Sequence, residues 1–292
     1  MSKLKIKISD MDKKRFLRNI KMGTKEWAYK NANCIQGCGV CIYCYAKAMA
    51  KRRGITEDEW NNKLIVWKRI NKNYLKLKPK GNAPWTYMFP TTHNIFIEEP
   101  YFSACVKLLD KLLKSGNTVL VTLKPFSKVV KKLCEQFQGY RDKMAYRFTI
   151  TSADNEILQI FEPKGPSLEE RLESLEFASE SGFSTSVSAE PLLDLQPYNL
   201  IKQVEPYLSK VDYSKDIGTI WIGLLKVKYI PKSLRKGKIL EHLNRLIPTL
   251  KFENVYRYYN ELYDHPRIKW KESIIKLMIQ NNVNVKELSL DT

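Results

Sequence analysis

The sequence contains no run of about 18 apolar residues, the length that a membrane-spanning helix requires. Its first residues alternate lysines with polar and single apolar residues, without the apolar core of a signal peptide. It also has no internal repeat and no low-complexity tract. These absences argue against the membrane, secreted and fibrous classes, and we expect a cytoplasmic protein without a membrane partner.

Acidic residues are few relative to basic ones. The chain has 31 Asp and Glu against 50 Lys and Arg, which gives a formal net charge of +19 and a pI near 9.5. Such a charge attracts polyanions such as nucleic acid. Because much of the excess is lysine in a chain rich in Asn and Ile, an A/T-biased coding sequence explains it equally well. Charge alone leaves both interpretations open.

The 292 residues, 43% of them hydrophobic, suffice for one large globular domain. From Trp85 onward, short apolar runs typical of strands alternate with amphipathic stretches of helical period. This alternation predicts a parallel sheet covered by helices, either doubly wound or a full or partial barrel. The predicted strands are 85–89, 118–123, 145–151, 183–189 and 218–225, and the predicted helices are 101–116, 126–138, 166–182 and 198–208.

The helix expected over 166–182 carries signals at both ends. Ser167 is the predicted N-cap, Glu170 completes a capping box, and Gly182 marks the C-terminal stop. Active sites of parallel α/β folds lie at the carboxyl ends of their strands. That rule selects the residues just past each predicted strand: 91–93, Lys124, 151–154, Glu190 and 224–226.

The composition changes after about Lys226. We interpret residues 226–292 as an extension packed on a main unit of residues 1–225, with a terminal helix beginning near Pro266. The stretch 255–263, VYRYYNELY, offers aromatic faces to a nucleic-acid strand, but at helical period it is more typical of a core-facing stripe.

Four of the six cysteines lie within eleven positions, at Cys34, Cys38, Cys41 and Cys44. In a reducing compartment this clustering favours a metal or redox centre over disulfides. Four thiols could hold a structural zinc ion, but zinc ligands are usually split between two knuckles, whereas an iron-sulfur cube accepts closely spaced thiolates. The remaining cysteines, Cys105 and Cys134, are expected to be small buried helix residues.

The loop NCIQGCGVCIYCYAK, residues 33–47, resembles the cluster loop of the radical S-adenosylmethionine (SAM) superfamily, in its spore photoproduct lyase-like branch. The resemblance continues in matching order through FPTTHNI (89–95), VTLKPF (121–126), RFTITSADNEIL (147–158), FEPKGPSLEERLESL (161–175) and FSTSVSAEPLLD (183–194). It spans residues 23 to 225.

One departure concerns the ligand spacing. The family reads C-x3-C-x2-C with an aromatic before the last cysteine, whereas Cys38, Cys41 and Cys44 read C-x2-C-x2-C. The YCYA phrase identifies Cys44 as the third ligand by similarity, so we predict Cys38, Cys41 and Cys44 as the ligands of a 4Fe-4S cluster. Cys34 is then a spare thiol, or a substitute ligand if the shortened loop changes register.

The resemblance implies a partial (β/α)6 barrel of the TIM type, with a C-terminal helical extension. It also implies SAM as a second cofactor, held at the strand ends. The residues that match its binding positions are Tyr43, Tyr45, Lys124, Thr149, Thr151, Arg171 and Glu190. A lysine after a strand is otherwise most often solvated, and Arg171 otherwise pairs with Glu170 or Glu173 on its own helix. His93 is a further candidate contact with substrate or cluster, weighed against an ordinary structural histidine.

By resemblance, the protein is expected to be an enzyme that cleaves SAM reductively to methionine and a 5'-deoxyadenosyl radical, which abstracts hydrogen from a substrate. Such chemistry needs an electron donor such as flavodoxin or ferredoxin. We expect the substrate to be a nucleic acid or nucleotide, with a peptide or small metabolite as alternatives. The competing hypothesis is a non-catalytic nucleic-acid-binding protein with a structural zinc site. The residues do not identify a catalytic side chain.

Overall fold

The computed structural model describes residues 23–78, 83–283 and 285. The first 22 residues of the predicted 1–225 unit lie outside the described residues, as do residues 79–82, 284 and 286–292. None of the described helices combines the length and the apolar character needed to cross a membrane.

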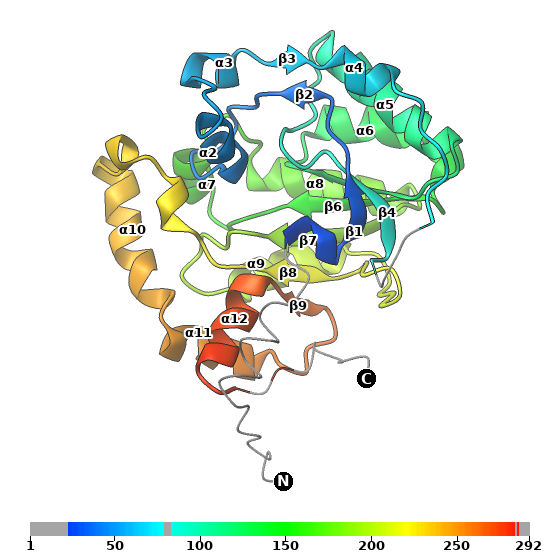
Figure 1. Cartoon of the computed structure of the whole chain (residues 1–292). Coiled ribbons are helices and arrows are strands. Elements are labelled where there is room, and N and C mark those ends of the chain that lie inside the picture. The colour runs from blue at the N-terminus through cyan, green and yellow to red at the C-terminus, as the bar shows by residue number, and fades with distance from the viewer. Residues whose placement is uncertain (1–22, 79–82, 284, 286–292) are drawn as a thin grey trace.

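A parallel sheet of seven strands forms the centre of the molecule (Figure 1). Its strands lie side by side in chain order, each pairing in parallel with the next. A doubly wound sheet would reverse its order at a switch point, whereas a barrel wall keeps it. The curled sheet is therefore a partial TIM-type barrel, as predicted. Its strands are β1 (Ala28–Asn31), β4 (Trp85–Phe89), β5 (Val119–Leu123), β6 (Met144–Thr149), β7 (Ser184–Ala189), β8 (Ile220–Ile222) and β9 (Ile268–Trp270).

Helices follow most strands and cover the sheet from outside (Figure 1). The connections after β4 to β7 carry α5 (Tyr101–Lys114), α6 (Ser127–Gln136), α7 (Asn155–Phe161), α8 (Leu168–Glu180) and α9 (Tyr198–Val204). A smaller subdomain between β1 and β4 contains β2 (Ile35–Gln36), α2 (Tyr45–Lys51), α3 (Glu57–Asn61), β3 (Leu64–Ile65) and α4 (Trp67–Asn71). The C-terminal part contains α10 (Gly237–Thr249), α11 (Phe252–Glu261) and α12 (Glu272–Gln280). Short 3-10 turns are η1 (Gly23–Glu26), η2 (Gln138–Tyr140), η3 (Glu205–Tyr207), η4 (Val227–Tyr229) and η5 (Lys232–Leu234).

The two faces of the sheet bury different sets of residues. Within β5, Val119 and Val121 belong to the main core with α5 and α6, whereas Leu120 faces a separate apolar cluster inside the barrel. This alternation follows from the two-residue period of a strand. The inner cluster also contains Trp27 and Trp221, whose rings meet edge to face at 5.4 Å. The barrel interior is thus filled with side chains.

The segment after Lys226 differs in one respect from the prediction. Residues 268–270 form β9, the last strand of the sheet, and the terminal helix begins only at Glu272, so the expected helix start near Pro266 is wrong. Ile268 and Trp270 alternate with one lysine in a buried edge strand. This strand is too short for its two-residue period to be recognised in the sequence. Val255, Tyr258 and Tyr259 of α11 are buried, which confirms the core-facing stripe.

The N-terminus of α8 is capped as predicted, but only by half of the capping box. The Ser167 hydroxyl accepts a hydrogen bond from the Glu170 amide at 3.3 Å. The Glu170 side chain instead accepts from the Ser127 amide on α6, at 3.0 Å. The carboxylate thus joins two neighbouring helices, a tertiary use that the local sequence does not reveal.

Candidate active site at the cysteine loop

The loop that carries the predicted ligands runs from the end of β2 to the start of α2. Gly37 and Gly39 on either side of Cys38 have φ angles of +102° and +78°, a region that glycine adopts without strain. Cys44 is the N-cap of α2, and its sulfur accepts a hydrogen bond from the Lys47 amide at 3.4 Å. The two glycines and the helix start bend the loop tightly around its thiols.

Cys38, Cys41 and Cys44 are half-buried, and all three interact with the ammonium group of Lys124. Burial raises the pKa of Cys38 to about 11, with a further contribution from Cys41. The hydrogen bond between Cys41 and Cys44 raises the pKa of Cys41 and lowers that of Cys44. Against burial, Lys124 acts to lower the pKa of each thiol and so favours the thiolate, the form that binds metals.

Cys34 lies apart from these three thiols. It is fully buried, with its sulfur 3.6 Å from the sulfur of Cys105 and 4.0 Å from Nε2 of His93. The Cys34 amide donates to His93 Nε2 at 3.2 Å, and His93 Nδ1 bonds the carbonyl of Asn94 at 2.8 Å. Both ring nitrogens of His93 are therefore occupied within the protein, which supports its interpretation as a structural histidine.

The chemistry of this donor set fits an iron-sulfur cluster. Cysteine thiolates are the usual ligands of 4Fe-4S clusters, and three of them leave one iron without a protein ligand. The half-buried positions of the three thiols and the cation beside them suit an anionic cluster. Over the described residues, no group of three or more His, Cys, Asp or Glu is arranged to hold a single metal ion.

Lys124 follows β5 and is fixed through its backbone. The Asn94 amide group donates to the Lys124 carbonyl at 3.1 Å and accepts from the Lys124 amide at 2.9 Å. The side chain is mostly buried, with Nζ 5.4 Å from the ring centre of Tyr43. Lys124 thus places a mostly buried positive charge at a fixed position beside the cysteine loop and is not a solvated surface residue.

A single buried carboxylate, Glu162, joins most of the predicted SAM-binding residues. It follows α7 and is 1% exposed. Arg171 Nη2 lies 2.7 Å from Oε2, Lys124 Nζ lies 3.7 Å from Oε1, and the Thr151 hydroxyl donates to Oε1 at 2.6 Å. The Tyr43 hydroxyl also donates to Oε1. Four residues from separate parts of the chain therefore share one acceptor.

The electrostatics of this group explain its charge states. Burial alone would raise the pKa of Glu162, but Lys124 and Arg171, with the hydrogen bonds from Thr151 and Tyr43, lower it to about 2. Burial disfavours the charged form of Lys124, yet Glu162 and Cys41 raise its pKa above the ordinary value. The Glu162 carboxylate and the Lys124 ammonium are therefore both charged at neutral pH.

Arg171 completes this group from α8. It is fully buried, its Nε donates to the Pro166 carbonyl at 2.9 Å, and its Nη1 donates to the carbonyl of Thr149 at 3.2 Å. The pairing with Glu170 or Glu173 that its helix offers does not occur, because the side chain turns inward toward Glu162.

Tyr45 and Glu190 do not join this group. Tyr45 is exposed on α2 and donates its hydroxyl to the Thr91 carbonyl at 2.5 Å. Glu190, just past β7, lies 3.7 Å from Nζ of Lys271, which also pairs with Glu26 at 2.9 Å. Burial raises the pKa of Glu26 to about 7. The structure thus places Glu190 at a second charged group, near the barrel interior.

Sequence reasoning missed Glu162 and Asn94. Glu162 stands between the apolar end of α7 and Pro163. An acidic residue directly after Phe161, which is buried, was the available signal that this carboxylate is buried as well. Asn94 directly follows the strand-end stretch 91–93, and nothing local distinguishes it from an ordinary loop asparagine.

Comparison with known proteins finds chains that are similar to this one at low sequence identity. No family model matches the chain. An uncharacterised protein of Acidianus two-tailed virus, ORF301, is 24% identical over 184 residues, which cover 61% of this chain and 58% of that protein. Among solved structures, spore photoproduct lyase complexed with dinucleoside spore photoproduct matches with a TM-score of 0.43 and 16% identity, over 70% of this chain and 58% of that chain.

A second solved structure is Streptococcus suis SuiB bound to its precursor peptide SuiA. It matches with a TM-score of 0.48 and 11% identity, over 90% of this chain and 54% of that chain. The similar solved structures are radical SAM enzymes. The chain spans little more than half the length of the relatives it matches.

Proposed function

We propose that this protein is a radical SAM enzyme that holds a 4Fe-4S cluster through Cys38, Cys41 and Cys44. The observation that carries the proposal is the placement of three half-buried thiols on one tightly turned loop, where the charge of Lys124 acts to lower the pKa of each. The sequence resemblance over residues 23–225 supports it independently. When bound, the cluster would pass an electron from a donor such as flavodoxin or ferredoxin into SAM, giving methionine and a 5'-deoxyadenosyl radical that abstracts hydrogen from the substrate.

The protein's own residues bind and orient in this proposal. Lys124 supplies a fixed positive charge for the SAM carboxylate, and Tyr43 packs against that lysine at the end of the cysteine loop. Glu162 is a positioning residue, because it holds Lys124, Thr151 and Tyr43 in place through one carboxylate. The parts proposed for Tyr45, Thr149, Arg171 and Glu190 in SAM binding remain predictions from the resemblance.

Anaerobic reconstitution with iron and sulfide tests the cluster. We expect about four iron atoms per chain and an electron paramagnetic resonance signal of the reduced protein that shifts when SAM is added. Release of methionine and 5'-deoxyadenosine under reduction would show turnover. A colourless protein with stoichiometric zinc would overturn the proposal in favour of a nucleic-acid-binding protein with a structural zinc site.

Lys124→Met tests the SAM site separately from the cluster. Loss of a hydrogen bond to a charged group costs about 1.5–3 kcal/mol, so we expect SAM affinity to fall by roughly 10- to 150-fold while iron content stays unchanged. The matched control is Lys128→Met on α6, where the side chain is exposed. Equal SAM affinity in both variants would remove Lys124 from the site.

A further inference from the structure

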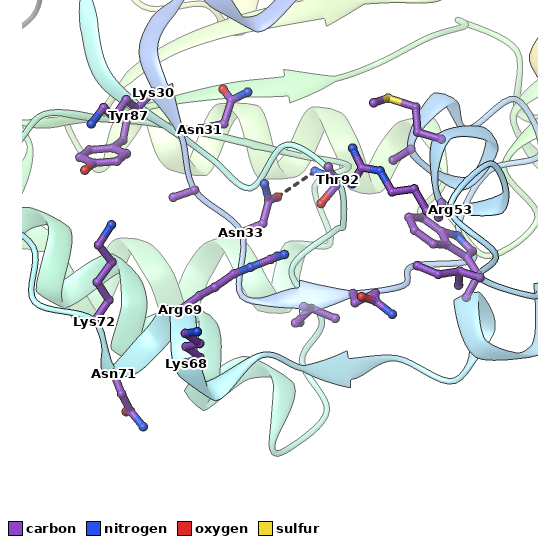
Figure 2. Close-up of a pocket in the computed structure, with 18 of the residues that line it drawn as sticks. Lys30, Asn31, Asn33, Arg53, Lys68, Arg69, Asn71, Lys72, Tyr87 and Thr92 are labelled. Carbon is purple, nitrogen blue, oxygen red and sulfur yellow. Dashed lines mark hydrogen bonds between the residues drawn. The ribbon is translucent and has the colours of Figure 1, made fainter.

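A cavity of about 970 Å³ lies beside β1, between this edge strand and the helices α2 and α4 (Figure 2). Lys30 and Asn31 of β1 line one wall, Ala46 and Ala50 of α2 a second, and the first residues of α4 a third. Asn33 stands in its middle and fixes the backbone amides of Thr91 and Thr92, whose nitrogens lie 2.8 and 2.9 Å from its Oδ1. Hydrogen bonds thus fix Asn33 in the middle of the cavity to the backbone of Thr91 and Thr92.

The lining carries positive charge only. No aspartate or glutamate lines the cavity, and its five cationic residues are exposed and form no ion pair with any described residue. In Figure 2, Arg53 reaches in from one side, while Arg69 and Lys72 come from the opposite wall. Cations that have no anionic partner among the described residues focus a positive potential in a concave surface. The five are Lys30, Arg53, Lys68, Arg69 and Lys72.

Aromatic side chains and an unsatisfied donor lie in the same lining. Trp60 is 4% exposed, and its Nε1 has no hydrogen-bond partner among the described residues. A buried donor left unpaired costs about 1–3 kcal/mol. Half-buried Tyr74 adds ring surface, and its ring meets that of Tyr87, which is 6% exposed, edge to face at 6.0 Å. Bases stack on such rings in single-strand binding sites.

We propose that this cavity binds single-stranded nucleic acid, with phosphates on its cations and at least one base beside its aromatic residues. A small anion would need two or three of these cations, not five on three walls. A duplex is too broad to enter a hollow of this size, whereas a single strand with splayed bases can. The inference goes beyond the proposed function and does not depend on the cluster, because no cysteine lines the cavity.

The test is fluorescence anisotropy of a labelled single strand of about 12 nucleotides, titrated with the reconstituted full-length protein at several salt concentrations. The variant Arg53→Ala/Arg69→Ala/Lys72→Ala should raise the Kd at least about tenfold and lower the slope of log K against log salt by about 2. The matched control, Lys128→Ala/Lys202→Ala/Lys251→Ala, removes the same charge from exposed positions on or beside α6, α9 and α11. It should change the Kd by less than about twofold.

Trp60→Phe adds a readout that charge does not control. It should weaken binding severalfold and leave the salt slope unchanged, since it removes aromatic surface together with the indole donor but no charge. Equal losses in the two triple variants would overturn the proposal, as would a duplex or polyglutamate that competes as well as the single strand. The proposed function fails separately, through an absent cluster or an unshifted signal with SAM, and SAM binding should be the same in both triple variants.

Discussion

Glu162 shows how one residue sets the charge pattern of the site. Its folded pKa of about 2 lies below the ordinary value of 4.5, so the folded state prefers the carboxylate. The associated stability is fully present above about pH 4.5 and is lost as the pH falls toward 2, with a magnitude of about 3 kcal/mol. Acid should therefore weaken the region that holds Lys124 and Arg171 as the pH falls from about 4.5 toward 2.

Glu162→Gln tests this role. The substitution leaves Lys124 and Arg171 buried without their anion, so we expect the free energy of unfolding at pH 7 to fall by about 3–5 kcal/mol. Urea unfolding followed by circular dichroism measures it. Glu173→Gln removes an exposed carboxylate that pairs with Lys131, and this control should cost at most about 1 kcal/mol. Similar losses in the two variants would contradict the part assigned to Glu162.

The cysteines give a second residue-scale prediction. Cys44→Ser should lose most of the iron after reconstitution, because it removes a proposed ligand. Cys34→Ser should keep it, since Cys34 is fully buried against Cys105 and His93. Iron and sulfide analysis measures both variants. An equal loss of iron in Cys34→Ser would return Cys34 to the ligand set.

The predicted residues of the site could be found from the sequence only where the chain carries a local motif. The three cysteines, Lys124 and Arg171 lie in phrases that resemble a family. Glu162 also lies in one of these phrases, but its part in the site depends on convergence with Tyr43, 119 positions away. Local patterns do not report which distant side chains share an acceptor.

At the scale of elements, the strands that the sequence revealed are those buried on both faces. β4, β5, β6 and β7 are almost wholly buried, and such strands read as continuous apolar runs. β1 and β9 are short and each contains a lysine, and they lie at the two edges of the sheet. Edge strands carry too little apolar pattern to be recognised without their neighbours.

The turn before the cysteine loop yields an element-scale prediction. A Cβ on Gly37 would lie 2.4 Å from the Trp60 carbonyl oxygen, at a φ of +102°. We expect Gly37→Ala to cost about 2–4 kcal/mol, from the backbone conformation and the clash together, and to reduce bound iron by displacing Cys38. Denaturant unfolding and iron analysis measure the two effects.

Gly54→Ala is the control for that backbone conformation. Gly54 has a φ of +84°, and a Cβ there meets nothing within 4 Å. Its substitution should cost only about 1–2 kcal/mol and leave iron binding unchanged. If both variants lose the same stability and the same iron, the contact with Trp60 has no special importance for the loop.

At the scale of the whole molecule, the barrel and the C-terminal segment share one core. Ile268, Trp270, Ile274 and Met278 belong to the same buried cluster as the strands of the main sheet. We therefore expect both parts to unfold in one transition, with coincident curves by tryptophan fluorescence and circular dichroism. A separate early transition of the C-terminal segment would contradict this.

Ile274→Ala measures the strength of that shared core. The side chain is fully buried on α12, so its truncation should cost about 2–5 kcal/mol and shift the whole transition. Ile247→Ala on α10 is the matched control, because that side chain is 44% exposed, and it should change stability by no more than about 0.5 kcal/mol.

The pairing of Lys271 with Glu26 also bears on the order in which the chain is synthesised and folds. The two residues are 245 positions apart, and the same ammonium lies 4.0 Å from the ring centre of Trp27. A chain emerges from the ribosome from its N-terminus and folds as it appears. Glu26 and Trp27 are synthesised well over two hundred residues before the cation that contacts them. The contact can therefore form only after synthesis has passed Lys271, and a ribosome that stops short of this residue releases a chain that cannot close it.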